Sequence, residues 1–106
     1  TVPELEAYMA GRGAIGDFLV ETFKGYSDDH FGWSKEIWDL APVAWLLNSD
    51  WTPSVLEHSP ILTDQMTWSI DRSRHLMRIA TGVRRNPIFA DLFRKVEAFA
   101  QRSATR

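Results

Sequence analysis

Apolar residues recur at helical spacing near both ends of the chain and alternate with polar residues in its middle. A first helix is predicted from Pro3 to Ala10, because proline suits the first turn and the following glycines end the helix. A second, amphipathic helix is predicted to end near Gly25, and residues 27–35 then form a polar loop. The apolar face predicted for the second helix is Ile15, Phe18, Leu19, Phe23 and Tyr26.

The most apolar segment follows Asp39 and runs from Leu40 to Leu47. Asp39 fits the N-cap of a helix, and Pro42 falls in the first turn, where its missing N–H costs no hydrogen bond. Every face of this helix is apolar. Such a helix belongs inside a protein, not on the surface of a small one.

The middle and the end of the chain predict strands followed by a helix. Val55 to Leu62 is predicted to be extended and broken by Pro60, and the segments 66–70 and 75–81 alternate like strands. Asn86-Pro87 is predicted to cap a long final helix. Its predicted buried stripe is Ile88, Phe89, Leu92, Phe93, Val96 and Phe99. We therefore predict an α+β fold, mainly helices with a small antiparallel strand meander and a long C-terminal helix.

The amino-acid composition excludes several classes of protein. The chain has 106 residues, 44% hydrophobic and 25% charged, which is typical of one ordered globular domain. A net charge of -2 argues against a bulk nucleic-acid binder, and the absence of cysteine removes disulfides and thiolate metal sites. No signal peptide or membrane-spanning run is present, so we expect a cytoplasmic protein with neither nucleic acid nor membrane as partner. Five Trp and six Phe are a demanding set to bury in so short a chain.

Few segments are candidates for chemistry, because the common phosphate-binding, zinc-protease and nucleophile motifs are missing. The segment Asp28-Asp29-His30 could bind a cation, although acidic loop residues are usually just solvated. Five arginines could contact phosphates, or could simply charge the exposed face of a strand and its flanking turns. They are Arg72, Arg74, Arg78, Arg84 and Arg85.

Asp39 has two interpretations. In the first it is only the N-cap of the apolar helix. In the second it is a partly buried carboxylate, kept ionised by the helix N-terminus and therefore a good ligand for a hard cation such as Ca²⁺. Because Ca²⁺ takes about six to eight oxygens, further ligands must then come from elsewhere. Trp38 beside it offers a flat apolar face on which a ring can stack.

Several segments resemble one family. The motif EIWDLA at residues 36–41, continued by VAWLL at 43–47, is similar to the C-terminal part of the nucleoside hydrolases that prefer inosine and uridine. SPILT at 59–63, DRSRH at 71–75 and NPIFADLF at 86–93 resemble the closing strands and helix of that family. The family's N-terminal DxDxxxDD cluster and its ribose-binding asparagine and glutamate motif are absent. The resemblance, strongest over residues 36–96, therefore implies a C-terminal fragment of about a third of an enzyme with an α/β fold.

The resemblance also implies an activity. In this family, water cleaves the N-glycosidic bond of a ribonucleoside, and a bound Ca²⁺ holds the ribose hydroxyls and the attacking water. Asp39 matches the C-terminal aspartate that closes the Ca²⁺ shell. Trp38 matches the preceding position, where a histidine of other members protonates the departing base; tryptophan cannot, so stacking or shaping of the base pocket is implied. Tyr26, in a stretch resembling the mobile loop, is a candidate substrate contact, and no catalytic residue is assigned in this chain.

Two hypotheses of different classes follow. In the first, the chain is the C-terminal portion of a Ca²⁺-dependent nucleoside hydrolase, inactive in isolation because most metal and ribose ligands are missing. That hypothesis predicts exposed apolar surface at residues 40–47 and allows a homo-oligomer that covers it. In the second, the chain is a non-catalytic small α+β module whose exposed aromatic residues dock a partner protein. The arginine-rich stretch adds a third interpretation, an RNA contact.

Overall fold

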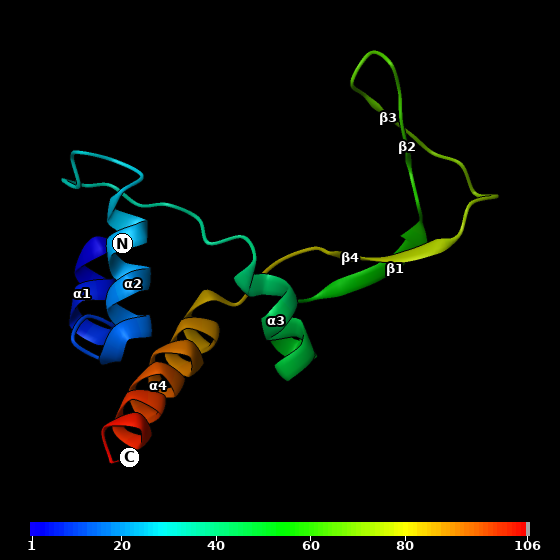
Figure 1. Ribbon diagram of the computed structural model, residues 1–106. Coiled ribbons are helices and arrows are strands. Elements are labelled where there is room, and N and C mark those ends of the chain that lie inside the picture. Colours follow the sequence, from blue (N-terminus) through cyan, green and yellow to red (C-terminus); the bar gives the residue numbers. More distant parts are fainter. Residues whose placement is uncertain (106) are drawn as a thin grey trace. The chain divides into compact units, whose positions relative to one another are not determined.

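The computed structural model describes residues 1–105 and divides into two compact units (Figure 1). Unit 1 comprises Thr1–Trp38 together with the chain from Arg85 onward, and unit 2 comprises Asp39–Arg84. Unit 1 is helical, whereas unit 2 holds all four strands and one α-helix. The predicted α+β class is therefore confirmed at the level of the elements.

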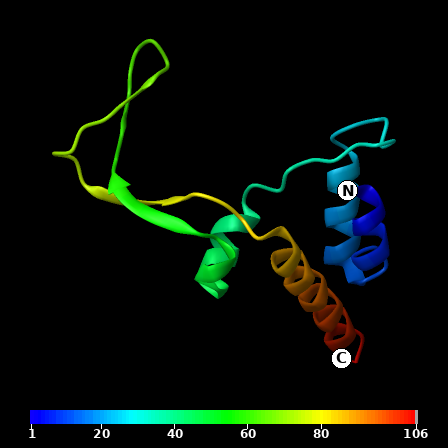
Figure 2. The same ribbon diagram turned by 180° about the vertical axis from the view of Figure 1, so that it is seen from behind.

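The helices of unit 1 are α1 (Val2–Tyr8), α2 (Gly13–Lys24) and α4 (Arg85–Ala104). The first begins one residue before the predicted Pro3 and ends two residues before the predicted Ala10. The Thr1 hydroxyl accepts the Glu4 N–H at 3.4 Å and caps the helix, and Pro3 lies in the first turn. Gly11 and Gly13 have φ angles of 73° and 77°, which only glycine adopts without strain, and they make the tight turn into α2. As a result α1 and α2 lie side by side in both views (Figures 1 and 2).

The core of unit 1 lies between α1 and α2 and consists of Val2, Leu5, Met9, Val20 and Phe23. Partly buried side chains from elsewhere in the unit pack against it, namely Ala10, Trp33, Leu92, Phe93 and Val96. Leu92, Phe93 and Val96 belong to α4, so the C-terminal helix completes the core between α1 and α2.

The apolar face predicted for α2 is only partly right. Phe23 is buried, but Ile15, Phe18 and Leu19 are 53%, 68% and 40% exposed. The helix instead turns Gly16 towards α1, where a Cβ atom would lie 2.4 Å from the Met9 carbonyl oxygen. The spacing of large apolar residues could not predict this face of α2, because the residue closest to α1 on this face is a glycine, which has no side chain.

The start of α4 also differs from the prediction. The helix begins at Arg85, so Asn86 lies inside its first turn rather than at the N-cap. Pro87 is tolerated there because the N–H groups of a first turn have no partner within the helix. The Arg85 guanidinium pairs with the Glu4 carboxylate, with Nη2 2.6 Å from Oε2, and so ties α4 to α1. Of the predicted buried stripe, Ile88 is buried and Phe99 is 49% exposed.

Unit 2 has the elements α3 (Leu40–Leu47), the short 3₁₀ helix η1 (Ser49–Trp51), β1 (Ser54–His58), β2 (Ile61–Leu62), β3 (Trp68–Ser69) and β4 (Leu76–Ala80). The strands pair β1 with β4 and β2 with β3, both antiparallel. The predicted meander is therefore wrong in its order, since the pairs are nested along one long hairpin (Figures 1 and 2).

Local signals explain where the hairpin is interrupted. Pro60 separates β1 from β2 as predicted, and the Ser59 N–H continues the ladder by donating to the His75 carbonyl at 2.8 Å. The return strand β3 is shorter than predicted, because Met66 has a φ of 61° in the turn that closes the hairpin. A second turn at residues 71–74 then leads into β4.

The apolar helix α3 has the predicted bounds and the expected surface. Ala44 is buried, whereas Val43, Leu46 and Leu47 are 50%, 76% and 55% exposed. The prediction of uncovered apolar surface on this helix is therefore confirmed. Over residues 1–105, no helix combines the length and the apolar character that crossing a membrane requires.

The close approach of α1 and α2 makes Gly16 a sensitive position. Gly16→Ala should lower the free energy of unfolding by at least roughly 1 kcal/mol, because overpacking against a fixed backbone oxygen exceeds the gain in helix propensity. Urea unfolding measures the change. Gly82→Ala is the matched control, since a Cβ there meets nothing within 4 Å. Equal effects of the two substitutions would contradict this description of the helix pair.

The ion pair between α1 and α4 predicts a pH dependence. Hydrogen bonding to Arg85 holds the pKa of the Glu4 carboxyl below its ordinary value of 4.5. A lowered folded-state pKa stabilises the protein above 4.5, and this contribution disappears as the pH falls through the folded value. Glu4→Gln should therefore cost about 0.5 kcal/mol at pH 7. Thermal unfolding should show wild type and variant converging in acid, and a constant difference at all pH values would refute the pairing.

Candidate functional site

Tyr26 lies just after α2, with its ring 65% exposed. The Lys35 Nζ sits 4.5 Å from the ring centroid, so one face of the ring is engaged in a cation–π contact. This contact holds the beginning and the end of the predicted polar loop together. The phenol of Tyr26 remains accessible to a ligand.

The middle of the loop is anchored by aromatic contacts. Trp33 lies 5.0 Å from the Phe23 ring and 5.4 Å from the His30 ring, measured between centroids. His30 Nε2 is 2.9 Å from the Lys24 carbonyl oxygen. The Asp29 carboxylate accepts the Phe31 N–H at 2.9 Å. These bonds give the acidic loop residues a structural role, which favours the solvated interpretation over a cation site.

Trp38 and Asp39 are adjacent in sequence, and the boundary between the two units falls between them. The Trp38 ring is 74% exposed. Asp39 occupies the N-cap position of α3 as predicted, but its side chain makes no cap hydrogen bond. It is also exposed, so the expectation of a partly buried carboxylate was wrong. The backbone at Asp39, with φ -73° and ψ -7°, is already helical, whereas a capping side chain needs an extended backbone.

The carboxylates and histidines of this chain could supply ligands for Ca²⁺ only if several of them lay close together. Residues 1–105 contain no group of three or more His, Cys, Asp or Glu side chains that could hold a metal ion. One carboxylate offers two oxygens, and Ca²⁺ takes about six to eight. The residues of this chain therefore do not by themselves fit a Ca²⁺ site, and Asp39 can be at most one ligand among several.

The five arginines of the arginine-rich stretch are divided between the two units, with Arg85 in unit 1 and the other four in unit 2. The Arg74 guanidinium donates to the Pro60 carbonyl oxygen at 2.6 Å, and Arg85 pairs with a carboxylate of unit 1. Arg72 is exposed in the turn before β4. Arg74 thus braces a turn and Arg85 the start of a helix, which favours the interpretation as charged strand and turn positions over a phosphate-binding run.

The turn at residues 71–74 has its own brace. The Asp71 carboxylate accepts from the Ser73 hydroxyl at 2.6 Å and from the Ser73 N–H at 2.9 Å. These two bonds hold the pKa of the Asp71 carboxyl below its ordinary range. The DRSRH segment that carries part of the family resemblance therefore has a structural role here.

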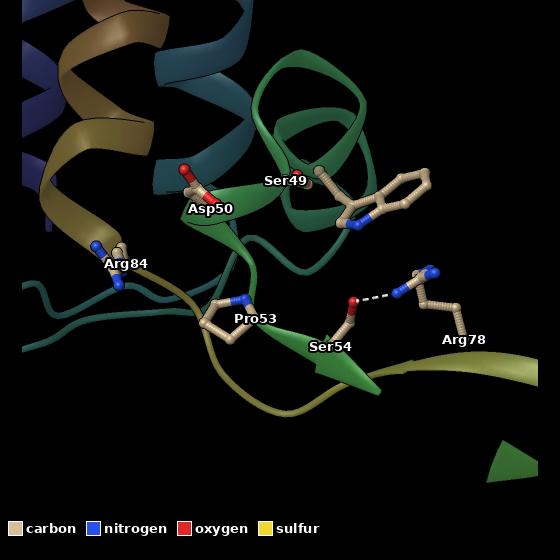
Figure 3. A pocket seen from close by; sticks show the side chains of 7 residues that line it. Ser49, Asp50, Pro53, Ser54, Arg78 and Arg84 are labelled. Atoms are coloured by element: carbon tan, nitrogen blue, oxygen red, sulfur yellow. Dashed lines mark hydrogen bonds between the residues drawn. The ribbon is translucent and has the colours of Figure 1, made fainter. Parts of the chain in front are cut away.

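Unit 2 contains a polar hollow that the sequence did not indicate (Figure 3). Arg78 lies over the Trp45 ring, 5.4 Å from its centroid, and its Nη1 donates to the Ser54 hydroxyl at 2.9 Å. Asp50 and Arg84 lie on the far side of the hollow from Arg78 in this view. The register of β1 and β4 brings Ser54 and Arg78 together, a pairing that the predicted meander does not contain.

None of the three candidate site residues lines this hollow or the groove between α1 and α4. Tyr26 and Trp38 belong to unit 1, and Asp39 belongs to unit 2. Each of the three is an exposed position.

The contacts of Arg78 can be tested directly. Arg78→Gln removes the cation–π contact and the hydrogen bond to Ser54, so the free energy of unfolding should fall by about 1 kcal/mol and the tryptophan emission of the chain should change. Arg72→Gln, at an exposed turn position, is the control and should leave both unchanged. Fluorescence-detected urea unfolding reports both quantities. If the two variants behave alike, the contact contributes nothing to the hollow.

Comparison with known proteins assigns this chain to no family. No protein-family model matches it. No curated protein and no solved structure matches it either. The function is therefore inferred from the residues of the chain itself.

Proposed function

We propose that this chain is the C-terminal part of a Ca²⁺-dependent, cytoplasmic nucleoside hydrolase, which uses water to cleave a ribonucleoside into base and ribose. The observation that carries the proposal is the exposed pair Trp38 and Asp39 at the start of an apolar, uncovered helix. On this proposal the chain alone is inactive, because the remaining metal and ribose ligands belong to residues outside it.

The surface of α3 supports the proposal. A helix that is apolar on every face is stable only when other elements cover it. In this chain Leu46 and Leu47 are 76% and 55% exposed. On the proposal, the rest of an open α/β domain lies over these side chains and places the helix in a larger core.

The free carboxylate of Asp39 supports the assignment as a metal ligand. Its oxygens form no hydrogen bond or ion pair with any of residues 1–105. An N-cap aspartate that acted only structurally would accept an N–H group of the first helical turn. Asp39 is therefore free to contribute oxygen ligands once further carboxylates are brought beside it.

The chemistry of glycoside cleavage assigns a role to Trp38. The transition state resembles an oxocarbenium ion, so the departing base must be held while the bond to the sugar lengthens. The indole N–H is only a hydrogen-bond donor and cannot protonate a base at neutral pH. The exposed ring of Trp38 can instead stack on the base, and the accessible phenol of Tyr26 can hydrogen-bond to the substrate.

A second candidate function is a non-catalytic interaction module. The observation that favours it is the number of aromatic rings at the surface, with Phe31 96% and Trp68 72% exposed. Exposed aromatic residues are typical of the centres of protein–protein interfaces. The coding sequence upstream of Thr1 discriminates the two functions, because the hydrolase proposal requires a DxDxxxDD motif there.

The metal-ligand assignment is tested in the longer protein that the proposal requires. Asp39→Asn should lower Ca²⁺ affinity and the turnover of inosine and uridine by about 100-fold, the order seen when a metal site loses a ligand or its support. Asp50→Asn, at an exposed aspartate of the same unit, is the control and should change neither. Calorimetry with Ca²⁺ and a base-release assay give the two readouts. Unchanged Ca²⁺ affinity in Asp39→Asn would sink the site assignment, and clear hydrolysis by the 106-residue chain alone would sink the fragment proposal.

A further inference from the structure

We propose that the tip of the hairpin in one copy of this chain docks into the groove between α1 and α4 of a second copy. The hairpin tip is defined here as residues 61–70, which carry β2 and β3. The proposal uses no residue of the candidate site, so it stands or falls independently of the proposed enzymatic function.

The hairpin tip has one apolar face. Leu62 and Trp68 are directly opposite each other in the register of β2 and β3, so their side chains share a face. They are 53% and 72% exposed. The other face carries Ile61 opposite Ser69, and the hydroxyls of Thr63 and Thr67, which lie 2.7 Å apart in a hydrogen bond. A hairpin of two short strands with an open apolar face needs a partner surface for stability.

The groove of unit 1 offers such a surface. Its floor is aromatic, with Tyr8 stacked on Phe93 at 5.1 Å between centroids and Phe89 at 5.8 Å from Phe93. The Tyr8 ring is 54% exposed. The hollow has a volume of about 440 Å³. That volume lies in the range of small-molecule pockets and can take an indole ring with an aliphatic neighbour.

Charge favours the hairpin tip as the occupant. Glu4 and Arg85 line the groove and neutralise each other, and Glu97 offsets one further cation. Arg12 and Arg94 also line it, and neither forms an ion pair with a carboxylate among residues 1–105.

The lining of the groove therefore carries a net positive charge. The only charged residue of the hairpin tip is Asp64, an exposed aspartate in the turn four residues before Trp68. In the proposed contact, Trp68 packs on the aromatic floor of the groove, and Asp64 lies near the arginines that line it.

The area buried in the contact sets the order of its expected affinity. A stable dimer buries about 800 Å² on each partner, and a single tip of this size covers less than that. Two reciprocal contacts about a two-fold axis double the buried area, whereas one-way contacts link copies into a longer assembly. Either arrangement gives reversible self-association with a dissociation constant in roughly the micromolar range.

Sedimentation velocity of the whole chain over a concentration series tests the proposal. The wild type should shift reversibly from monomer to dimer or to longer assemblies, and added salt should weaken the shift. Trp68→Ala should weaken association at least about tenfold, the loss expected of a central aromatic anchor. Phe31→Ala is the matched control, because this ring is 96% exposed outside both surfaces and its removal should change nothing.

A charge exchange tests the pairing of the two surfaces. Asp64→Arg and Arg94→Asp should each weaken association, and the double variant Asp64→Arg/Arg94→Asp should recover most of it. Circular dichroism of each variant confirms that the fold is kept. A chain that stays monomeric throughout, or a Trp68→Ala variant that behaves like Phe31→Ala, overturns the proposal. A double variant no better than the single ones overturns the placement of the tip in this groove.

Discussion

The packing of α4 on the core formed by α1 and α2 is the constraint on which the rest of the fold depends. Leu92, Phe93 and Val96 reach that core from the end of the chain, and the ion pair of Arg85 with Glu4 fastens the beginning of α4. Unit 1 is thus closed by segments from both ends of the sequence. The intervening residues must leave unit 1 and return to it, and a hairpin is the simplest strand arrangement that does so.

Two backbone hydrogen bonds in unit 2 bring its two ends together. The Arg84 N–H donates to the Trp51 carbonyl at 2.7 Å, and the Thr81 N–H donates to the Pro53 carbonyl at 2.8 Å. These two bonds close the base of the hairpin just before the chain re-enters unit 1. The nested strand order follows, because the first strand must lie beside the last. In a meander, the last strand pairs with the strand before it and not with the first, so the chain would not return to its starting point.

Much of the apolar surface of this chain is left uncovered by its own elements. Small chains cannot bury every large side chain, because the buried share of the surface falls with size. Here many of the uncovered residues lie on α3, on the hairpin tip and on α2. We propose that the rest of a larger enzyme covers α3 and that a second copy covers the hairpin tip. The aromatic excess of the composition is therefore a property of the surface as much as of the core.

The sequence by itself determined the local features. The end of α2, the bounds of α3, the break at Pro60, the loop at residues 27–35 and the N-cap position of Asp39 all depend on a few neighbouring residues, and each was predicted. The tertiary structure alone decided the strand order, the buried face of α2, the engagement of Arg74 and Arg85, and the exposure of Asp39. These depend on contacts between distant segments, such as Gly16 with Met9 or Ser54 with Arg78. No local pattern encodes such pairs, because the energy of each contact exists only once the chain has brought the two segments together.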